Sequence, residues 1–325
     1  MAYRLKRQSS GALALHNSAN GETMHPVWGP WEEATRLYVQ GSGLENLLAA
    51  RPGQGDREEA VLFDVGLGAA ANALAALECH ARLRRRGPVR PLRLISFEND
   101  LEPLRFALAH AGQLGYLLGH EPCLEALAAE GRWSGAHGQS WELRLGDFPR
   151  LIREEPRRAD LVFFDPFSPR ANPDMWSVAT LEGIFRCRRP GGAMRLVTYS
   201  SAFSTRAALL LAGFHVGAGI ALDGRRRATE AATYFSSLAE PLDLRWLNRW
   251  KRERDPWPCL TAPDRRRQAR QTLLDHSQWS QFAQGPRPER AEHAMARSGG
   301  KRNLLPRREQ ARRRARQGKA ATESR

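Results

Sequence analysis

The sequence predicts an α/β fold built on a mostly parallel, doubly wound sheet. Three observations support this prediction. Short apolar runs alternate with longer stretches of helical composition, a glycine-rich turn joins the first such pair, and the last two strands follow one another directly. Alternating strands and helices are typical of a parallel sheet that is covered on both faces. The two consecutive strands predict an antiparallel edge strand, a common ending for mixed sheets.

The expected elements follow one another regularly from residue 60 onward. Strands are expected at 60–65, 92–97, 141–145, 160–164 and 193–198, with the closing pair at 214–218 and 229–235. Helices are expected at 31–38, 44–50, 69–85, 103–118, 122–130, 149–154, 178–185 and 204–212.

Changes in composition divide the chain into four parts. Residues 1–20 are polar and lack periodicity, so we expect a flexible N-terminal arm, and the alternating pattern places the folded domain at 21–238. Residues 239–260 form an appendix rich in tryptophan and arginine. Residues 261–325 mix charge runs with Gln, Ala, Ser and Gly, a composition that cannot bury enough apolar surface to fold alone. We therefore expect a basic, disordered tail there.

The positive charge is concentrated in that tail. The chain has a formal net charge of +15, and residues 261–325 hold 17 lysines and arginines against 6 acidic residues, which leaves the rest of the chain near balance. A basic tail adds affinity for a polyanion, but a solvating extension without a fixed partner fits the composition as well.

Targeting signals and metal motifs are not evident in the sequence. No run approaches the roughly 18 apolar residues of a membrane span, and no apolar stretch follows the basic N-terminus, so we expect a cytoplasmic protein without a membrane partner. The four scattered cysteines include no C-x-x-C pair. They predict reduced, structural thiols, and no metal is expected.

Four expected strands end on an acidic residue: Asp64, Glu98, Asp147 and Asp165. Ligands bind outside the carboxyl ends of the strands in an open parallel sheet, so these side chains are expected at one ligand site. Ordinary helix capping is the alternative explanation, and it is strongest for Asp147.

A glycine-rich turn follows the first acidic residue. Gly66 and Gly68 let the backbone approach a ligand closely. The Asp64 carboxylate disfavours a phosphate and favours an ammonium group, which suits the amino-acid part of S-adenosylmethionine. Glu98 can then accept the ribose hydroxyls, and Asp147 the adenine amino group. A nicotinamide cofactor is the chemical rival, but Ala71 stands where its fingerprint has a third glycine, and nothing marks a hydride-transfer site.

The fourth strand end leads into a proline-rich loop at 165–176. The prolines fix a rigid backbone. The carboxylate of Asp165 and nearby backbone carbonyls can accept N–H bonds and aim the lone pair of an amine at a methyl donor, and Asp165 can also take the proton. An aromatic ring of the loop can stack on a flat base. The candidate substrate-binding residues are Pro166, Phe167, Ser168, Asn172 and Trp176.

Structural explanations exist for each of these residues. The loop can be a rigid turn without a catalytic role, and Phe167 and Trp176 can equally be core aromatics. His25 can act as a base, although a single loop histidine is more often structural.

Together these residues resemble the methyltransferase domain of the MnmC type, which completes 5-methylaminomethyl-uridine at the tRNA wobble position. The family's acidic residue, G-x-G and Asn correspond to Asp64, Gly66, Gly68 and Asn72, its S-F-E strand end to Glu98, and its G-D step to Asp147. The most specific match is D-x-F-x-P-x-x-N-P-x-x-W at 165–176. Residues 21–25 and 32–34 also resemble the family's N-terminal segment.

The resemblance implies a Rossmann-like class I methyltransferase that uses S-adenosylmethionine. It implies Asp165 as the catalytic residue and Asp64, Gly66, Gly68, Asn72, Glu98 and Asp147 as cofactor-binding residues. The late G-x-K-R of the family resembles 224–227, so Arg225, Arg226 and Arg227 are expected to contact a phosphate of tRNA.

Two departures from the family pattern affect these expectations. Ala70 replaces the third glycine of the turn, which is expected to tighten the turn and weaken cofactor binding. The flavin-dependent oxidase domain of the two-domain members has no counterpart here, so no FAD is expected, and other enzymes would supply the aminomethyl-uridine.

Three hypotheses of function therefore stand. The first is an N-methyltransferase acting on an aminomethyl-uridine in tRNA. The second keeps the chemistry but methylates another amine, in a small molecule or a protein. The third is a non-catalytic RNA-binding protein on a methyltransferase fold. The oligomeric state is left open.

Overall fold

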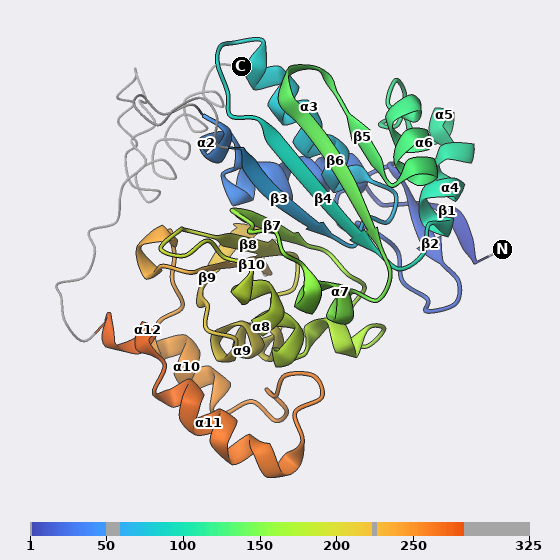
Figure 1. Cartoon of the computed structure of the whole chain (residues 1–325). Helices are drawn as coiled ribbons and strands as arrows, with labels where there is room; N and C mark the ends of the chain where they lie inside the picture. Colours follow the sequence, from blue (N-terminus) through green and yellow to red (C-terminus); the bar gives the residue numbers. More distant parts are fainter. Residues whose placement is uncertain (1, 50–58, 223–225, 283–325) are drawn as a thin grey trace, which may run out of the picture. The chain divides into compact units, whose positions relative to one another are not determined.

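An eight-stranded sheet forms the centre of the computed structural model, which describes residues 2–49, 59–222 and 226–282 (Figure 1). The strand order is β5-β6-β4-β3-β7-β8-β10-β9. The five strands from β6 to β8 in that order run parallel, and β5, β10 and β9 add antiparallel pairings at the two ends. The strands are β3 (Ala60–Val65), β4 (Leu92–Glu98), β5 (Arg132–Ser134), β6 (Gln139–Leu145), β7 (Leu161–Phe164), β8 (Arg195–Thr198), β9 (His215–Ala221) and β10 (Arg227–Ala232).

Helices cover both faces of this sheet, as the alternating pattern predicts. Successive strand residues point to opposite faces, so Leu62 and Leu94 pack on the side of α3, while Val61 and Ile95 pack on the side of α8 and α9. The helices are α1 (Pro30–Glu33), a π-helix at Ala34–Gln40, α2 (Leu44–Leu48), α3 (Ala71–Arg84), α4 (Glu102–Ala109), α5 (Ala111–Leu114), α6 (Glu121–Glu130), α7 (Phe148–Glu154), α8 (Val178–Arg186), α9 (Phe203–Leu211), α10 (Leu244–Trp250), α11 (Arg266–Leu274) and α12 (Ser277–Ser280). The predicted fold class, a doubly wound and mostly parallel sheet with an antiparallel edge, is confirmed.

The N-terminal segment differs from its prediction. Instead of a flexible arm at 1–20, β1 (Tyr3–Arg7) and β2 (Leu13–Asn17) form an antiparallel hairpin. Tyr3 and Leu15 are buried in the core on the α3 side, and the Asn17 amide donates to the Tyr3 hydroxyl at 3.1 Å. The prediction of an arm was wrong because the hairpin has few apolar residues, and it is stable only where these meet the main domain.

The Trp/Arg-rich appendix predicted at 239–260 also belongs to the folded body. Trp246 and Trp250 are one helical turn apart on α10, and both are buried against the face of the sheet that α8 and α9 cover. The prediction of a disordered tail from residue 261 is wrong for residues 261–282, because α11 and α12 pack on the same cluster through Leu273 and Trp279. Residues 283–325, where the rest of that prediction falls, lie outside the described residues.

This C-terminal part covers the outer edge of β9. The Gln278 side chain is fully buried, accepts from the Val216 amide at 2.7 Å, and donates to the carbonyls of Val216 and Leu242. The Ala218 amide, on β9, donates to the Glu240 carbonyl, and Gly217 forms an antiparallel bridge with Pro241 at the same edge. A bare edge strand is a template for unwanted pairing, so this covering completes the sheet.

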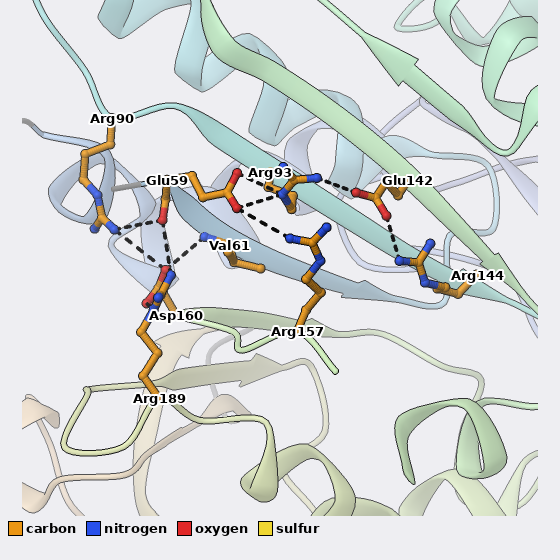
Figure 2. Close-up of polar contacts among 9 residues, drawn as sticks. All are labelled: Glu59, Val61, Arg90, Arg93, Glu142, Arg144, Arg157, Asp160 and Arg189. Atoms are coloured by element: carbon orange, nitrogen blue, oxygen red, sulfur yellow. Dashed lines mark hydrogen bonds and ion pairs between the residues drawn. The ribbon is translucent and has the colours of Figure 1, made fainter. Parts of the chain in front are cut away.

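An ion-pair network ties the strands together near their amino-terminal ends (Figure 2). The Glu59 carboxylate accepts hydrogen bonds from the Arg93 guanidinium at 2.9 Å, and the same guanidinium also donates to Glu142. Asp160 accepts from the Arg189 guanidinium and from the backbone amide of Val61, both at 2.9 Å. Arg93 and Arg189 thus pair with carboxylates of this network. The loops that carry the candidate site follow the opposite, carboxyl ends of the strands.

All four cysteines are free, and three of them are buried, as the sequence predicts. Among the described residues, no helix is long and apolar enough to cross a membrane.

Candidate active site

A cavity of about 570 Å³ opens at the carboxyl ends of β3, β4, β6 and β7. Its walls come from the loops that follow these strands and from the segment between β2 and α1. The sequence-predicted residues that line it are Gly66, Gly68, Glu98, Asp147, Asp165, Pro166, Phe167, Ser168 and Asn172. The parallel sheet thus brings together residues that are more than a hundred positions apart in the sequence, from Gly66 to Asn172.

The glycine-rich turn after β3 presents bare backbone to the cavity. Gly66 has φ +90°, and a Cβ there would lie 2.8 Å from the Asp165 carbonyl oxygen, so only glycine fits. Gly68 has φ +51°, and its amide donates to the Glu98 carboxylate at 2.9 Å. The turn is therefore held against the next two strand ends and leaves space for a ligand on its other side.

Ala70 adopts φ +65° at the start of α3, a conformation that costs an alanine about 1 kcal/mol or more. Its methyl group is fully buried in the core. Ala70 does not line the cavity, so any effect on a ligand has to pass through the shape of the turn.

Glu98 and Asp147 present carboxylates on neighbouring strand ends. Burial raises the pKa of Glu98, although backbone amides of Gly68 and Asn99 stabilise its charge. Asp147 precedes α7, but its side chain makes no capping hydrogen bond. Helix capping therefore does not explain this carboxylate, which remains free to accept from a ligand.

Asp64 does not line the cavity, which corrects its predicted direct contact with the cofactor. Its side chain is fully buried beneath the turn, and Oδ2 accepts from the Ser96 hydroxyl at 2.7 Å. Ser96 in turn accepts from the Trp141 indole. Burial raises the pKa of Asp64 to about 7. Asp64 thus supports the turn from inside the sheet, because strand alternation directs its side chain toward the core on the α3 side.

Asp165 lies at the centre of the cavity wall. Its Oδ2 accepts from the Asn72 amide at 2.7 Å and lies 3.8 Å from the His25 imidazole. Burial raises the pKa of Asp165 to about 6, and His25 opposes that rise. Asn72, predicted to bind the cofactor, is itself buried and does not line the cavity, and its amide holds the Asp165 carboxylate.

The proline-rich loop is anchored by hydrogen bonds from aromatic side chains. The Tyr199 hydroxyl donates to the Pro166 carbonyl at 3.0 Å, and the Trp176 indole donates to the Phe167 carbonyl at 2.8 Å. Trp176 is almost completely buried between Phe164 and Tyr199. It is a core aromatic that holds the loop, which corrects its prediction as a substrate contact.

Ser168 fastens the loop to the N-terminal part of the chain. Its amide donates to Glu22 at 2.9 Å, and its hydroxyl donates to the same carboxylate. This part of the cavity wall therefore joins the loop after β7 to the segment between β2 and α1.

The two described members of the predicted arginine cluster do not line this cavity. Arg225 lies outside the described residues, and neither Arg226 nor Arg227 is among the lining residues. The Arg227 guanidinium, on β10, pairs with Glu240 and donates to the Gly219 carbonyl at 2.9 Å. A free phosphate contact by Arg227 is thus not what the structure shows.

Sequence reasoning missed several residues of the site. Glu22, Glu33 and Tyr199 line the cavity, and His25, a loop histidine of the kind that is more often structural, lies between Glu33 and Asp165. Glu22, His25 and Glu33 lie in the N-terminal segment that resembles the family, a resemblance that assigns them no role, and the sequence marked His25 only as a possible base. Tyr199 lies far from that segment.

The cavity is strongly acidic. Seven carboxylates line it, and no lysine or arginine is among the described lining residues. They are Glu22, Glu33, Glu98, Asp100, Asp147, Asp165 and Asp174. Such a wall attracts cations and repels phosphate groups. Among the described residues, no cluster of His, Cys, Asp and Glu has the geometry to hold a metal ion.

Comparisons with known proteins agree with this geometry. A family model described as S-adenosyl-L-methionine-dependent methyltransferase matches residues 125–234. The chain is 30% identical over 211 residues to the tRNA 5-methylaminomethyl-2-thiouridine biosynthesis bifunctional protein MnmC of Polaromonas naphthalenivorans, covering 60% of this chain and 30% of that protein. It is 33% identical over 196 residues to the MnmC of Paracidovorax citrulli, covering 57% and 28%. The chain thus spans about 30% of the length of these relatives.

A solved structure resembles the chain over a larger share. The crystal structure of MnmC2 from Aquifex aeolicus superposes with a TM-score of 0.62 and 25% sequence identity, covering 84% of this chain and 83% of that one.

The fold, the cavity and these matches define an S-adenosylmethionine-dependent methyltransferase of the α/β class. Within that class, the matched part of the chain is related to MnmC.

The residues of the cavity fit S-adenosylmethionine. The turn presents bare backbone at Gly66 and Gly68, and the Glu98 and Asp147 carboxylates lie on the neighbouring strand ends. The acidic wall suits a ligand with a sulfonium and an ammonium group. A dinucleotide, whose pyrophosphate is anionic, would meet the same carboxylates unfavourably.

Proposed function

We propose that this protein methylates the aminomethyl nitrogen of a modified wobble uridine in tRNA, with S-adenosylmethionine as the methyl donor. The observation that carries the proposal is the position of Asp165, a carboxylate that is only 13% exposed, in a cavity lined by seven carboxylates and no basic side chain among the described residues. An aminomethyl group is a cation at neutral pH, and this wall is built to attract one. The tRNA itself is suggested by the names of the related MnmC proteins.

In this proposal, Gly66, Gly68, Glu98 and Asp147 hold the cofactor. The turn approaches it with its backbone, Glu98 accepts its ribose hydroxyls, and Asp147 accepts its adenine amino group. When bound, S-adenosylmethionine supplies a methyl group on a positively charged sulfur, so the acceptor needs only a free lone pair. Asp64 and Asn72 act indirectly, by supporting the turn and Asp165.

Asp165 prepares the acceptor. Its carboxylate accepts a hydrogen bond from an N–H group of the aminomethyl substituent. It then takes up that proton, which leaves the nitrogen with a lone pair. Pro166, Phe167, Ser168 and Asn172 form the wall beside it and position the uridine, because the loop that carries them is rigidly anchored. Positioning supplies a large part of the rate enhancement in such a reaction.

The test is methyl transfer from labelled S-adenosylmethionine to bulk tRNA from cells that lack this protein, followed by nucleoside analysis. We expect label in 5-methylaminomethyl-uridine or its 2-thio form, and we expect it to disappear with Asp165→Ala. Label that stays in other nucleosides, or none at all, would contradict the proposal.

A second candidate is methylation of a different amine, because an acidic cavity attracts any cationic amine. A protein that binds the cofactor but labels no tRNA would favour this candidate. A protein that binds RNA and no cofactor would favour a non-catalytic role, although the ordered turn and the three cavity carboxylates Glu98, Asp147 and Asp165 argue against it.

A further inference from the structure

His25 is held between two carboxylates that belong to distant parts of the chain. Its Nε2 lies 3.8 Å from Asp165 Oδ2, after β7, and its Nδ1 lies 3.7 Å from Glu33 Oε1, on α1. The His25 side chain is only 9% exposed, and it lines the cavity. The three side chains form one row, Glu33–His25–Asp165, at the wall where the acceptor amine is expected.

The backbone at His25 is strained to reach this position. His25 has φ +51°, in the left-handed region that non-glycine residues seldom adopt. Its buried Nδ1 has no hydrogen-bond partner within the described residues. A strained residue with an unsatisfied buried polar atom is retained only where the surrounding structure holds it, and such residues gather at functional sites.

The groups around the imidazole favour its charged form. Burial alone would lower the pKa of His25, but the carboxylates of Asp165, Glu33 and Asp64 outweigh burial and raise it. Asp165 in turn faces His25, Glu33, Asn72 and the phenol of Tyr38, whose pKa is raised well above its ordinary value, so Tyr38 stays neutral.

We propose that His25 is a positioning residue: held as an imidazolium between Glu33 and Asp165, it keeps Asp165 ionised so that Asp165 can accept the proton of the substrate amine. This inference rests on the proposed amine methylation for the identity of the proton donor. The Glu33–His25–Asp165 row itself does not depend on it.

The proton balance of the step is simple. One N–H bond of the substrate ammonium breaks and its proton moves to Asp165 Oδ, while the nitrogen keeps the electron pair. His25 does not gain or lose a proton in that step. Without its positive charge, the repulsion from the Glu33 and Asp64 carboxylates would be unopposed, and Asp165 would bind a proton before the substrate arrives.

The first test measures the imidazole directly in the full-length protein without ligands. Histidine ring signals are followed by NMR against pH, and His25 is assigned by its loss in His25→Asn. Asparagine is the matched replacement because it tolerates a left-handed backbone. We expect His25 to titrate above the ordinary histidine pKa of about 6.5, and to titrate lower in both Asp165→Asn and Glu33→Gln. A His25 that titrates at or below the ordinary value, or that ignores both substitutions, would overturn the inference.

The second test compares pH–rate profiles of methyl transfer. Activity needs ionised Asp165, so it falls as pH drops through the pKa of that carboxyl. In His25→Asn, we expect this acid limb to move up by about one pH unit or more, as for the loss of an opposite charge within 4–6 Å, with KM for the cofactor little changed. His120→Gln, which alters a histidine paired with Glu78 outside the cavity, is the control and should leave the profile unchanged.

The outcomes separate the two proposals. An unmoved acid limb in an active His25→Asn would refute the role of His25 while leaving the methylation intact. A raised His25 pKa that responds to both carboxylates, in a protein that methylates no tRNA, would support the row and refute the assigned substrate.

Discussion

Two aspartates at neighbouring strand ends, Asp64 and Asp165, lie in different surroundings because their side chains point to different places. Asp165 follows the last residue of β7 and faces the cavity, where Asn72 and His25 contact it. Asp64 belongs to β3, and its side chain lies on the α3 face of the sheet beside Ser96 of the neighbouring strand β4. In the proposed function, Asp165 therefore accepts a proton from the substrate, whereas Asp64 supports the glycine-rich turn.

Replacing Asp165 by asparagine keeps the shape of the side chain and removes its ability to take a proton. We expect Asp165→Asn to lower the rate of methyl transfer by about 100-fold or more, the usual contribution of a proton acceptor. Cofactor affinity, measured by calorimetry, should change little. Glu182→Gln, at an exposed position of α8 outside the cavity, is the control and should retain full activity. A fall of equal size in both variants would show that the loss does not come from the Asp165 carboxylate.

The pKa of Asp64 makes stability depend on pH. A carboxyl with a folded pKa of about 7 binds a proton on folding, so its stabilising contribution is complete below its unfolded pKa near 4 and is lost as the pH rises through 7. Asp165 and Glu98, whose pKa values burial also raises, act in the same direction. We expect urea unfolding to show lower stability at pH 8 than at pH 5, by a few kcal/mol at most.

The variant Asp64→Asn should make this pH dependence clearly shallower, because the new amide side chain does not titrate. The exposed Asp264→Asn is the control and should follow the natural protein. An equally steep dependence in Asp64→Asn would mean that other groups cause it.

The sequence predicts the positions of the site residues better than their directions. Strand ends are marked by apolar runs, so the places of Glu98, Asp147 and Asp165 follow from the pattern. Whether a strand-end side chain points into the core or toward the ligand site depends on a shift of one residue along the strand. The sequence does not specify that shift, so Asp64 was assigned to the ligand. His25 reaches the cavity from a segment whose path no local pattern specifies.

At the scale of elements, the strands and helices of 60–238 were predicted nearly completely, and the two ends of the chain were not. Each end depends on tertiary contacts. The β1–β2 hairpin is anchored by Tyr3 and Leu15, and α10 to α12 are anchored by tryptophans set among arginines. A few large apolar residues can dock a helix whose average composition is polar, because its stability comes from tertiary packing.

Gln278 is the most specific of these anchors. Removing its amide would leave the Val216 N–H and two carbonyls at the β9 edge buried without their partner. We expect Gln278→Ala to lower the free energy of unfolding by about 2–3 kcal/mol, as measured by urea denaturation. Gln271→Ala, an exposed position on α11, should stay within about 0.5 kcal/mol. A Gln278→Ala protein as stable as the natural one would show that α12 is not needed to cover the edge.

At the scale of the whole molecule, two opposite charge distributions coexist. The cavity is acidic, whereas the chain carries a net charge of +15. Such a protein can attract an RNA backbone to its surface while its cavity selects a cationic group of that RNA.

Salt should therefore affect the two binding events differently. Between about 50 and 200 mM salt, we expect affinity for tRNA to fall by about tenfold or more, while affinity for S-adenosylmethionine changes much less, because the cofactor binds in a partly enclosed cavity. Filter binding and calorimetry measure the two. A tRNA affinity that does not respond to salt would contradict a phosphate-driven contact.

The proposed substrate is tested most directly with two anticodon stem-loop RNAs that differ at one position. One carries 5-aminomethyl-uridine at the wobble position and the other carries uridine. The protein is incubated with S-adenosylmethionine and each RNA, and the molecular mass of each product is measured by mass spectrometry. We predict that one methyl group is added to the first RNA and none to the second, and that Asp165→Asn adds none to either. Equal methylation of both RNAs, or of neither by a protein that binds the cofactor, would contradict the assignment of the amine as the acceptor.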